Sequence, residues 1–271
     1  MTTPSLSSRK PAISSRRPLT LTSPSPPTSE DGPVPGDVII TIDGPAGTGK
    51  STVAHRLASR LGLEFLDTGA MYRAAALLAI ERGIDPTDGP ALAEAVRQAD
   101  LHFDWSADPP RVLLGARDVT KRIRDLDVSG CVSIVASQPA LRRELVERQR
   151  IIARRHPRLV TEGRDQGSVV FPDAAVRFYL DADPHVRATR RVEQMALAGK
   201  VVNFDDVLAD IQGRDRLDGS RADGPLIKPH GALVIDTSRL TLDEVVDRLE
   251  HEVRTRVAAR VGSAGASGDV T

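Results

Sequence analysis

The chain has few cysteines, few aromatic residues and no net charge, and each of these shortages argues against a particular kind of structure or partner. Its 271 residues include one cysteine, Cys131, so an intrachain disulfide is excluded and a reducing, cytoplasmic compartment is favoured. The 37 basic residues balance the 37 acidic ones, so no overall field draws the protein to nucleic acid. Aromatic residues make up 3% of the chain, which predicts an aliphatic core. No apolar run approaches the length of a membrane span.

Both ends of the chain lack a hydrophobic period. Residues 1–36 are rich in Ser, Thr and Pro, which predicts a disordered tail. The first 29 residues carry four basic residues and no acid, as organellar transit peptides do, although their prolines oppose an amphipathic helix. A flexible tail and a targeting segment therefore both stay open. We expect residues 259–271 to form a second flexible tail and residues 37–258 to form the folded domain.

Short apolar runs alternate with helical patterns through this domain. We expect helices at Ser51–Leu61 and Ala70–Arg82, and a last helix that Thr241 and Glu244 open with the spacing of a capping box. Strands alternating with helices predict an α/β fold whose parallel sheet is flanked by helices. The expected strands are Asp37–Asp43, Leu63–Asp67, Arg158–Gly163, Ala175–Asp181 and Gly231–Thr237.

One segment breaks this alternation. Leu101–Ile123 contains two β-prone runs around a Pro-Pro pair, followed by a turn with glycine. We predict a small antiparallel β insert at about residues 101–125. Its tryptophan, Trp105, is expected to be a packing residue.

The stretch "GPAGTGKS", Gly44 to Ser51, matches the phosphate-binding pattern G-x-x-x-x-G-K-[ST]. Glycines let the backbone curl so that successive N–H groups point at phosphate oxygens, while Lys50 reaches the terminal phosphates and the Ser51 hydroxyl suits Mg²⁺. The pattern follows an expected strand and opens an expected helix, which is the context that supports it. The residues expected to bind ATP are Gly44, Gly47, Thr48, Gly49, Lys50, Ser51 and Thr52.

This cradle serves GTPases, transport ATPases and small-molecule kinases alike. We find no Asn-Lys-x-Asp guanine reader downstream, which disfavours a GTPase. Arginines follow the expected strands: Arg73 the second, Arg164 the third. Because the carboxyl ends of parallel strands meet at one rim, these side chains are expected beside the cradle. Several guanidiniums near a triphosphate indicate transfer between two phosphate-bearing groups.

A third group of charges lies in "RDRLDGSR". If this stretch is helical, Arg214, Asp218 and Arg221 share one face. An exposed ladder of ion pairs would explain the same spacing, so both interpretations stay open here.

Five blocks, in this order and spacing, resemble the bacterial-type cytidylate kinase family: "IDGPAGTGKST", "DTGAMYR", "VSIVASQPALR", "EGRDQGSVVFPDA" and "RDRLDGSRADGPL". The resemblance covers about Val38 to Leu249. It implies a P-loop kinase with a monophosphate-binding β insert and a short lid at about residues 184–204. It further implies the reaction ATP + CMP → ADP + CDP, with dCMP also used and with Mg²⁺ arriving with ATP.

The resemblance also implies roles for individual residues. Phosphate binding would fall to Arg73, Arg164, Arg214 and Arg221, with the Thr68 hydroxyl beside the monophosphate. The catalytic residues it implies are Lys50, Arg164, Arg187, Arg191 and Arg214, and the arginines at the lid are Arg187, Arg190 and Arg191.

Selection of the nucleotide would rest on a second group of residues. The resemblance assigns the reading of cytosine to Ser133, Arg142 and Asp165, and the ribose hydroxyls to Asp218. A turn role for Asp165 and a pure ion-pair role for Asp218 stay open. The chain departs from the family pattern in its long amino-terminal tail and at Gln166, where an aliphatic residue is expected.

Other functions remain to be separated from this one. A kinase for UMP, AMP or shikimate is the nearest alternative, and a P-loop switch protein without small-molecule turnover is another. We expect a monomer, because the sequence shows no sustained heptads.

Overall fold

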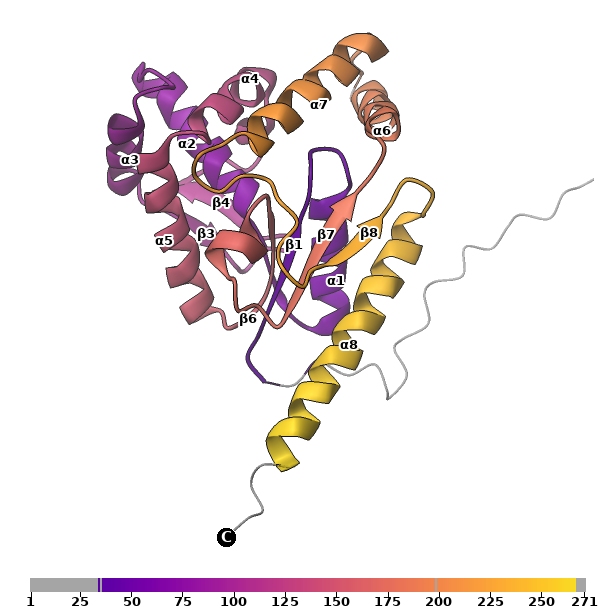
Figure 1. The fold of residues 1–271 in the computed structure, drawn as a ribbon. Coiled ribbons are helices and arrows are strands. Elements are labelled where there is room, and N and C mark those ends of the chain that lie inside the picture. Colours follow the sequence, from indigo (N-terminus) through magenta and orange to yellow (C-terminus); the bar gives the residue numbers. More distant parts are fainter. Residues whose placement is uncertain (1–33, 35, 198, 267–271) are drawn as a thin grey trace, which may run out of the picture.

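A five-stranded parallel sheet forms the centre of the molecule (Figure 1). The computed structural model describes residues 34, 36–197 and 199–266. The sheet order is β2-β6-β1-β7-β8, so the first strand lies in the middle between β6 and β7. The expected α/β fold is confirmed, and all five strands lie within two residues of their expected bounds. The strands are β1 (Val38–Asp43), β2 (Glu64–Asp67), β6 (Arg158–Gly163), β7 (Val176–Asp181) and β8 (Leu233–Asp236).

Aliphatic cores cover both faces of this sheet, as the low aromatic content predicts. One core joins the sheet to α1 (Lys50–Leu61) and α8 (Leu242–Ala266). The other is built around α2 (Thr68–Arg82) and helices α3 to α5. Apolar strand residues therefore pack on both sides, as is usual for parallel sheets. The remaining helices of this layer are α3 (Gly89–Gln98), α4 (Leu126–Val135) and α5 (Pro139–Arg155), with the short turns η1 (Arg122–Arg124) and η2 (Gln166–Val170).

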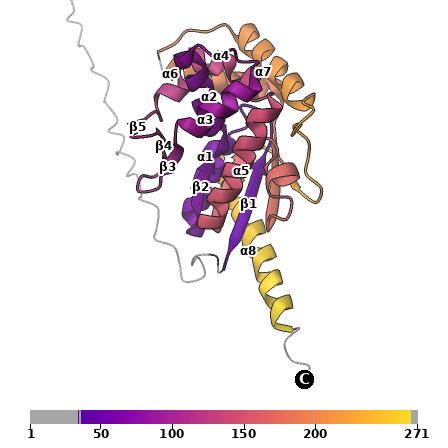
Figure 2. The ribbon, with the colours of Figure 1, turned by 90° about the vertical axis from the view of Figure 1, so that its left-hand side faces the viewer.

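The predicted β insert is present. Strands β3 (Leu101–Asp104), β4 (Arg111–Leu114) and β5 (Arg117–Asp118) pair antiparallel, and Figure 2 shows them on one side of the molecule. Trp105 stacks on the His156 ring at a centroid distance of 4.1 Å, which agrees with the expected packing role.

Two helices stand over the carboxyl ends of the strands. These are α6 (Pro184–Leu197), which lies in the region expected to form the lid, and α7 (Phe204–Gly219), which begins where that region ends. The two helices pack against each other (Figure 1). Helix α7 ends at Gly219, so the expectation that Arg221 shares its helical face is wrong. The Arg221 guanidinium nevertheless reaches Asp218 from the loop that follows.

The ends of the ordered fold also differ from the expected bounds. The Val34 side chain is buried against the α1 core, and its N–H donates to the Leu61 carbonyl, so packing begins before residue 37. At the other end α8 continues to Ala266, so the boundary expected at residue 259 is too early. The rest of the two expected tails lies outside the described residues.

The last helix begins as its sequence predicts. The Glu244 carboxylate accepts from the Thr241 N–H and hydroxyl, and the Thr241 hydroxyl accepts from the Glu244 N–H. This reciprocal pair satisfies backbone donors at the start of α8. Within the described residues, no helix combines the length and apolar character needed to cross a membrane.

Replacing Phe178→Ala should lower the free energy of unfolding by about 3–5 kcal/mol, because a fully buried ring leaves a cavity under the sheet. Urea denaturation followed by circular dichroism measures this. The matched control is Val234→Ala on the adjacent strand β8, where the side chain is 45% exposed and the loss should stay below about 1 kcal/mol. Equal losses for the two variants would contradict the assignment of the core.

Candidate active site

The Gly-rich loop joins β1 to α1, as the sequence predicts. Gly44 has φ 148°, and a Cβ there would lie 2.1 Å from the Leu180 carbonyl oxygen, so only glycine fits. Gly49 caps α1 with φ 88°. Lys50 Nζ donates to the Pro45 carbonyl at 2.7 Å, which holds the lysine along the inside of the loop. The loop therefore has the strand–turn–helix shape that presents backbone N–H groups to phosphate.

Two buried acids lie beneath this loop. Glu162, at the end of β6, accepts a 2.7 Å hydrogen bond from the Ser51 hydroxyl. Asp43, at the end of β1, accepts from the backbone N–H groups of Gln166 and Gly167. Burial raises the pKa of Asp43 to about 6, and burial also raises the pKa of Glu162. Burial lowers the pKa of Lys50. The loop is therefore lined by ionisable groups whose charged forms a bound cation or phosphate would stabilise.

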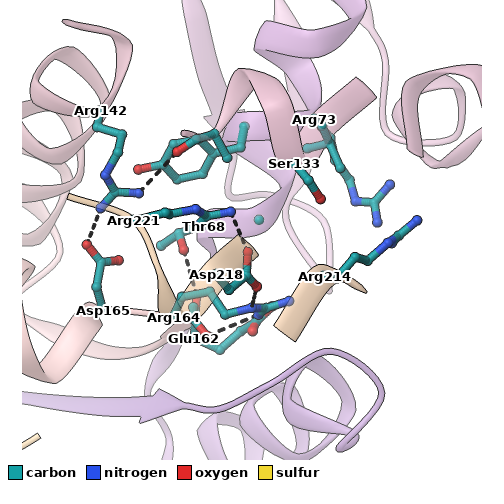
Figure 3. A pocket seen from close by; sticks show the side chains of 15 residues that line it. Thr68, Arg73, Ser133, Arg142, Glu162, Arg164, Asp165, Arg214, Asp218 and Arg221 are labelled. Atoms are coloured by element: carbon teal, nitrogen blue, oxygen red, sulfur yellow. Dashed lines mark hydrogen bonds and ion pairs between the residues drawn. The ribbon is translucent and has the colours of Figure 1, made fainter. Parts of the chain in front are cut away.

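Beside the loop, residues from distant parts of the chain line one pocket. The pocket is bounded by the end of β6 and the loop after it, by α2, α4 and α5, and by α7 with the loop that follows α7 (Figure 3). All nine residues expected to bind the substrate line it, although they span most of the domain. They are Thr68, Arg73, Ser133, Arg142, Arg164, Asp165, Arg214, Asp218 and Arg221.

A single carboxylate holds two of the pocket arginines. Asp218 accepts from Arg164 Nε at 2.8 Å and from the Arg221 guanidinium (Figure 3). Burial lowers the pKa of Arg164, but the carboxylates of Asp218 and Glu162 more than offset this and leave it raised. The ion-pair interpretation of Asp218 is thus what this structure displays. A ribose contact stays a proposal.

Two more of the five pocket arginines come from different helices, Arg73 from α2 and Arg214 from α7. Arg73 Nη1 donates to the Ser129 hydroxyl at 2.8 Å, and Arg214 Nη2 donates to the Ser129 carbonyl at 3.4 Å. Figure 3 shows both guanidiniums extending toward the same side of the pocket. Burial lowers the pKa of Arg73, and Arg214 and Arg124 add to this effect. The arginines therefore form a cluster whose mutual repulsion an anion would relieve.

At the other end of the pocket, Arg142 and Asp165 form a buried ion pair. The Arg142 guanidinium also lies over the Tyr72 ring, 5.7 Å from its centroid. Burial raises the pKa of Asp165, and Arg142 opposes that rise. Asp165 therefore does more than cap a local turn: its side chain faces the pocket and is held by a charge from α5.

The three lid arginines lie in different surroundings, and none lines the pocket. Arg187 is buried, and its guanidinium donates to the carbonyls of Ala182 and Ala46. Arg190 donates to Thr237, while the half-buried Arg191 donates to Gln194. Of these arginines, Arg187 is the one in contact with the Gly-rich loop.

Sequence reasoning missed several residues of the site. Tyr72 and Glu162 line the pocket, and the Asp43 carboxylate accepts hydrogen bonds from the backbone of the loop after β6. Position could have indicated the two acids, since each lies at the end of a central strand, at the ligand-binding edge of the sheet.

The departure from the family pattern at Gln166 also has a structural reason. Its buried amide accepts from the Thr161 hydroxyl and donates to Gln149, so a polar network replaces aliphatic packing here.

Comparison with known proteins agrees with this geometry. The family model described as "Cytidylate kinase" matches residues 40–255. A cytidylate kinase of Corynebacterium efficiens is 47% identical over 79% of this chain and 93% of that protein. One of Mycolicibacterium paratuberculosis is 44% identical over 81% of this chain and 96% of that protein. Among solved structures, a shikimate kinase from Bacteroides thetaiotaomicron has a TM-score of 0.43 and 14% identity, over 80% of this chain and 98% of that one, which decides nothing about the substrate.

The likeness in sequence covers both the phosphate loop and the arginine-lined pocket. With the family model spanning most of the described residues, the chain is a kinase that belongs to the cytidylate kinase family.

Proposed function

We propose that this chain transfers the γ-phosphoryl group of ATP to CMP and dCMP, giving ADP with CDP or dCDP. One observation carries the proposal. Nine side chains from separate segments line one pocket next to the Gly-rich loop, and five of them are arginines. A second phosphate-bearing substrate is what such a cluster suits, because the planar guanidinium binds phosphate through two parallel hydrogen bonds.

The chemistry needs alignment and cancellation of charge. The acceptor is a phosphate monoester, whose second pKa is about 6 by analogy with phosphorylated side chains. Its oxygen is therefore already a nucleophile at neutral pH, and we propose that no general base takes part. The obstacle is repulsion between two polyanions. Arg73, Arg164, Arg214 and Arg221 would neutralise the CMP phosphate, and Lys50 would bind the terminal phosphates of ATP.

The residues beneath the loop fit a magnesium ion. The Ser51 hydroxyl and the Glu162 carboxylate are 2.7 Å apart, and the buried Glu162 gains from a nearby cation because burial raises its pKa. Oxygen donors of this kind suit Mg²⁺, with Ser51 as the proposed ligand. When bound with ATP, the ion would supply positive charge that offsets the charge of the phosphates.

Selection of the base would rest on the buried pair of Arg142 and Asp165. Cytosine carries an exocyclic amine, which a carboxylate accepts, whereas uracil presents a carbonyl at that position. With uracil bound, the Asp165 oxygen would meet a lone pair and stay unsatisfied in a buried site. Such a mismatch separates analogues by orders of magnitude. Ser133, which lines the same pocket from α4, is proposed as a further contact to the base.

The remaining parts of the proposal concern the movement of the lid, the cellular compartment and the oligomeric state. We propose that α6 and α7 move toward the Gly-rich loop when ATP binds, which would exclude water from the transfer. We also propose a cytoplasmic monomer, given the single cysteine and the absence of heptads in the sequence. A P-loop switch protein is disfavoured by the acceptor-side arginines, which a switch does not need.

The proposal predicts ADP formation that depends on the acceptor. ADP release should be measured with CMP, dCMP, UMP, AMP and shikimate, and with no acceptor. CMP and dCMP should give the highest kcat/KM. The kcat/KM values for UMP and AMP should be lower by orders of magnitude. Equal ADP release without an acceptor would indicate a switch or ATPase, and preference for another acceptor would remove the cytosine-reading role.

Replacing Asp165→Asn should reduce the CMP/UMP ratio of kcat/KM by at least about tenfold, because the amide no longer offers two acceptor oxygens to the cytosine amine. Steady-state kinetics with both nucleotides measures the ratio. Asp173→Asn is the matched control, because this exposed carboxylate lies outside the pocket and its loss should leave the ratio unchanged. Thermal melting checks that the variant, with Arg142 unpaired, remains folded. An unaltered ratio in folded Asp165→Asn removes this residue from base reading.

Comparing CMP with dCMP separates the two interpretations of Asp218. If the carboxylate contacts the ribose, Asp218→Asn should lose several-fold more kcat/KM with CMP than with dCMP. If Asp218 acts only by holding Arg164 and Arg221, both substrates should lose activity equally. The ratio of the two losses, measured in one set of kinetics, distinguishes the outcomes.

A further inference from the structure

A second carboxylate of α7 holds the guanidinium that contacts the Gly-rich loop. Asp215 Oδ2 lies 2.7 Å from Arg187 Nη2. The Arg187 side chain is 4% exposed, and a buried guanidinium requires a partner of opposite charge. Its other contacts are backbone carbonyls: Nε donates to Ala182 at 3.0 Å, and Nη1 donates to Ala46 of the loop at 3.1 Å. Arg187 therefore joins the phosphate loop directly to α7.

Asp215 and Asp218 are three residues apart on α7, and side chains at this spacing lie on neighbouring parts of one helix face. Asp215 holds Arg187 at the loop proposed to bind ATP, and Asp218 holds Arg164 and Arg221 in the pocket proposed to bind CMP. One helix thus carries a carboxylate to each of the two sites. The Asp215 charge also reaches the acceptor side, where it is among the acids that raise the pKa of Arg164.

The protein does not fully satisfy Asp215. Its other oxygen, Oδ1, is buried and has no hydrogen-bond partner among the described residues. Unsatisfied polar groups of this kind are costly, and they mark an arrangement that can change its partners. A phosphate oxygen near the loop would compete with Asp215 for Arg187.

We propose that Asp215 is a positioning residue that couples the two nucleotide sites. In this proposal, which rests on the function proposed above, the Arg187–Asp215 pair fixes α7 relative to the Gly-rich loop. Phosphates bound at the loop attract Arg187 and shift α7, and with it Asp218 and the acceptor arginines. CMP bound in the pocket acts on the same helix from the other end. Each nucleotide therefore changes the affinity for the other, and by the same factor, as linkage requires.

The test measures this coupling by calorimetry on the full chain. A non-hydrolysable ATP analogue with Mg²⁺ is titrated into the protein with and without CMP, and CMP is titrated with and without the analogue. The wild-type protein should bind each nucleotide at least about fivefold more tightly in the presence of the other. In Asp215→Asn, which keeps the shape and removes the charge, this factor should fall to about one, while CMP alone binds within about twofold of wild type.

Two further variants control for fold and for charge. Asp206→Asn removes an exposed charge from the first turn of the same helix and should keep the wild-type factor. Asp215→Glu keeps the charge and should retain most of the coupling, which a purely structural role would not predict. Thermal melting with each variant reports folding. If Asp215→Asn does not fold, loss of coupling in Arg187→Gln, compared with retention in Asp215→Glu, decides the same question.

The outcomes separate this inference from the proposed function. If wild-type protein does not bind CMP, the proposed function fails. If CMP binds but the wild-type factor is one, or if folded Asp215→Asn keeps the wild-type factor, the coupling role of Asp215 is wrong while the kinase activity stands.

Discussion

The site depends on holding several guanidiniums close together until phosphates replace their partners. Two like unit charges about 6 Å apart repel by roughly 3 kcal/mol at an effective dielectric near 20. The structure offsets this with carboxylates: Asp218 lies between Arg164 and Arg221, and Asp215 holds Arg187. Each partner is an oxygen acid that a phosphate can replace with similar geometry. The protein therefore keeps its arginines folded inward, and substrates meet positive charge that is already in place.

The fold explains how such remote residues meet. Strand β1 lies between β6 and β7, so the Gly-rich loop is central at the carboxyl edge of the sheet. The first residue of α2, directly after β2, and the loop after β6 bring Thr68 and Arg164 to the same edge, and α7 forms another side of the pocket. The glycine at position 44 is required because the Leu180 carbonyl passes so close to it. Chain topology thus places the acceptor pocket beside the donor loop, and helix α7 spans both.

Much of this arrangement could be predicted from local patterns. The Gly-rich loop, the strands and the capping box at Thr241 depend on neighbouring residues, and these predictions are confirmed. The grouping of the pocket residues was expected from the rim that parallel strands share and from the family resemblance. Side-chain partners could not be predicted in this way. Nothing in "RATRR" distinguishes the buried Arg187 from the half-buried Arg191, because the carboxylate that holds Arg187 comes from a later helix. The end of α7 before Arg221 was missed because charge spacing carries no information about where a helix stops.

The most direct measurement is a crystal structure of the protein with CMP and a non-hydrolysable ATP analogue bound together with Mg²⁺. The account predicts that Arg73, Arg164, Arg214 and Arg221 each place a guanidinium nitrogen within about 3 Å of a phosphate oxygen. It also predicts that Lys50 contacts the terminal phosphates of the analogue. Guanidiniums that remain on Asp218 and Ser129 while the phosphates bind elsewhere would contradict it.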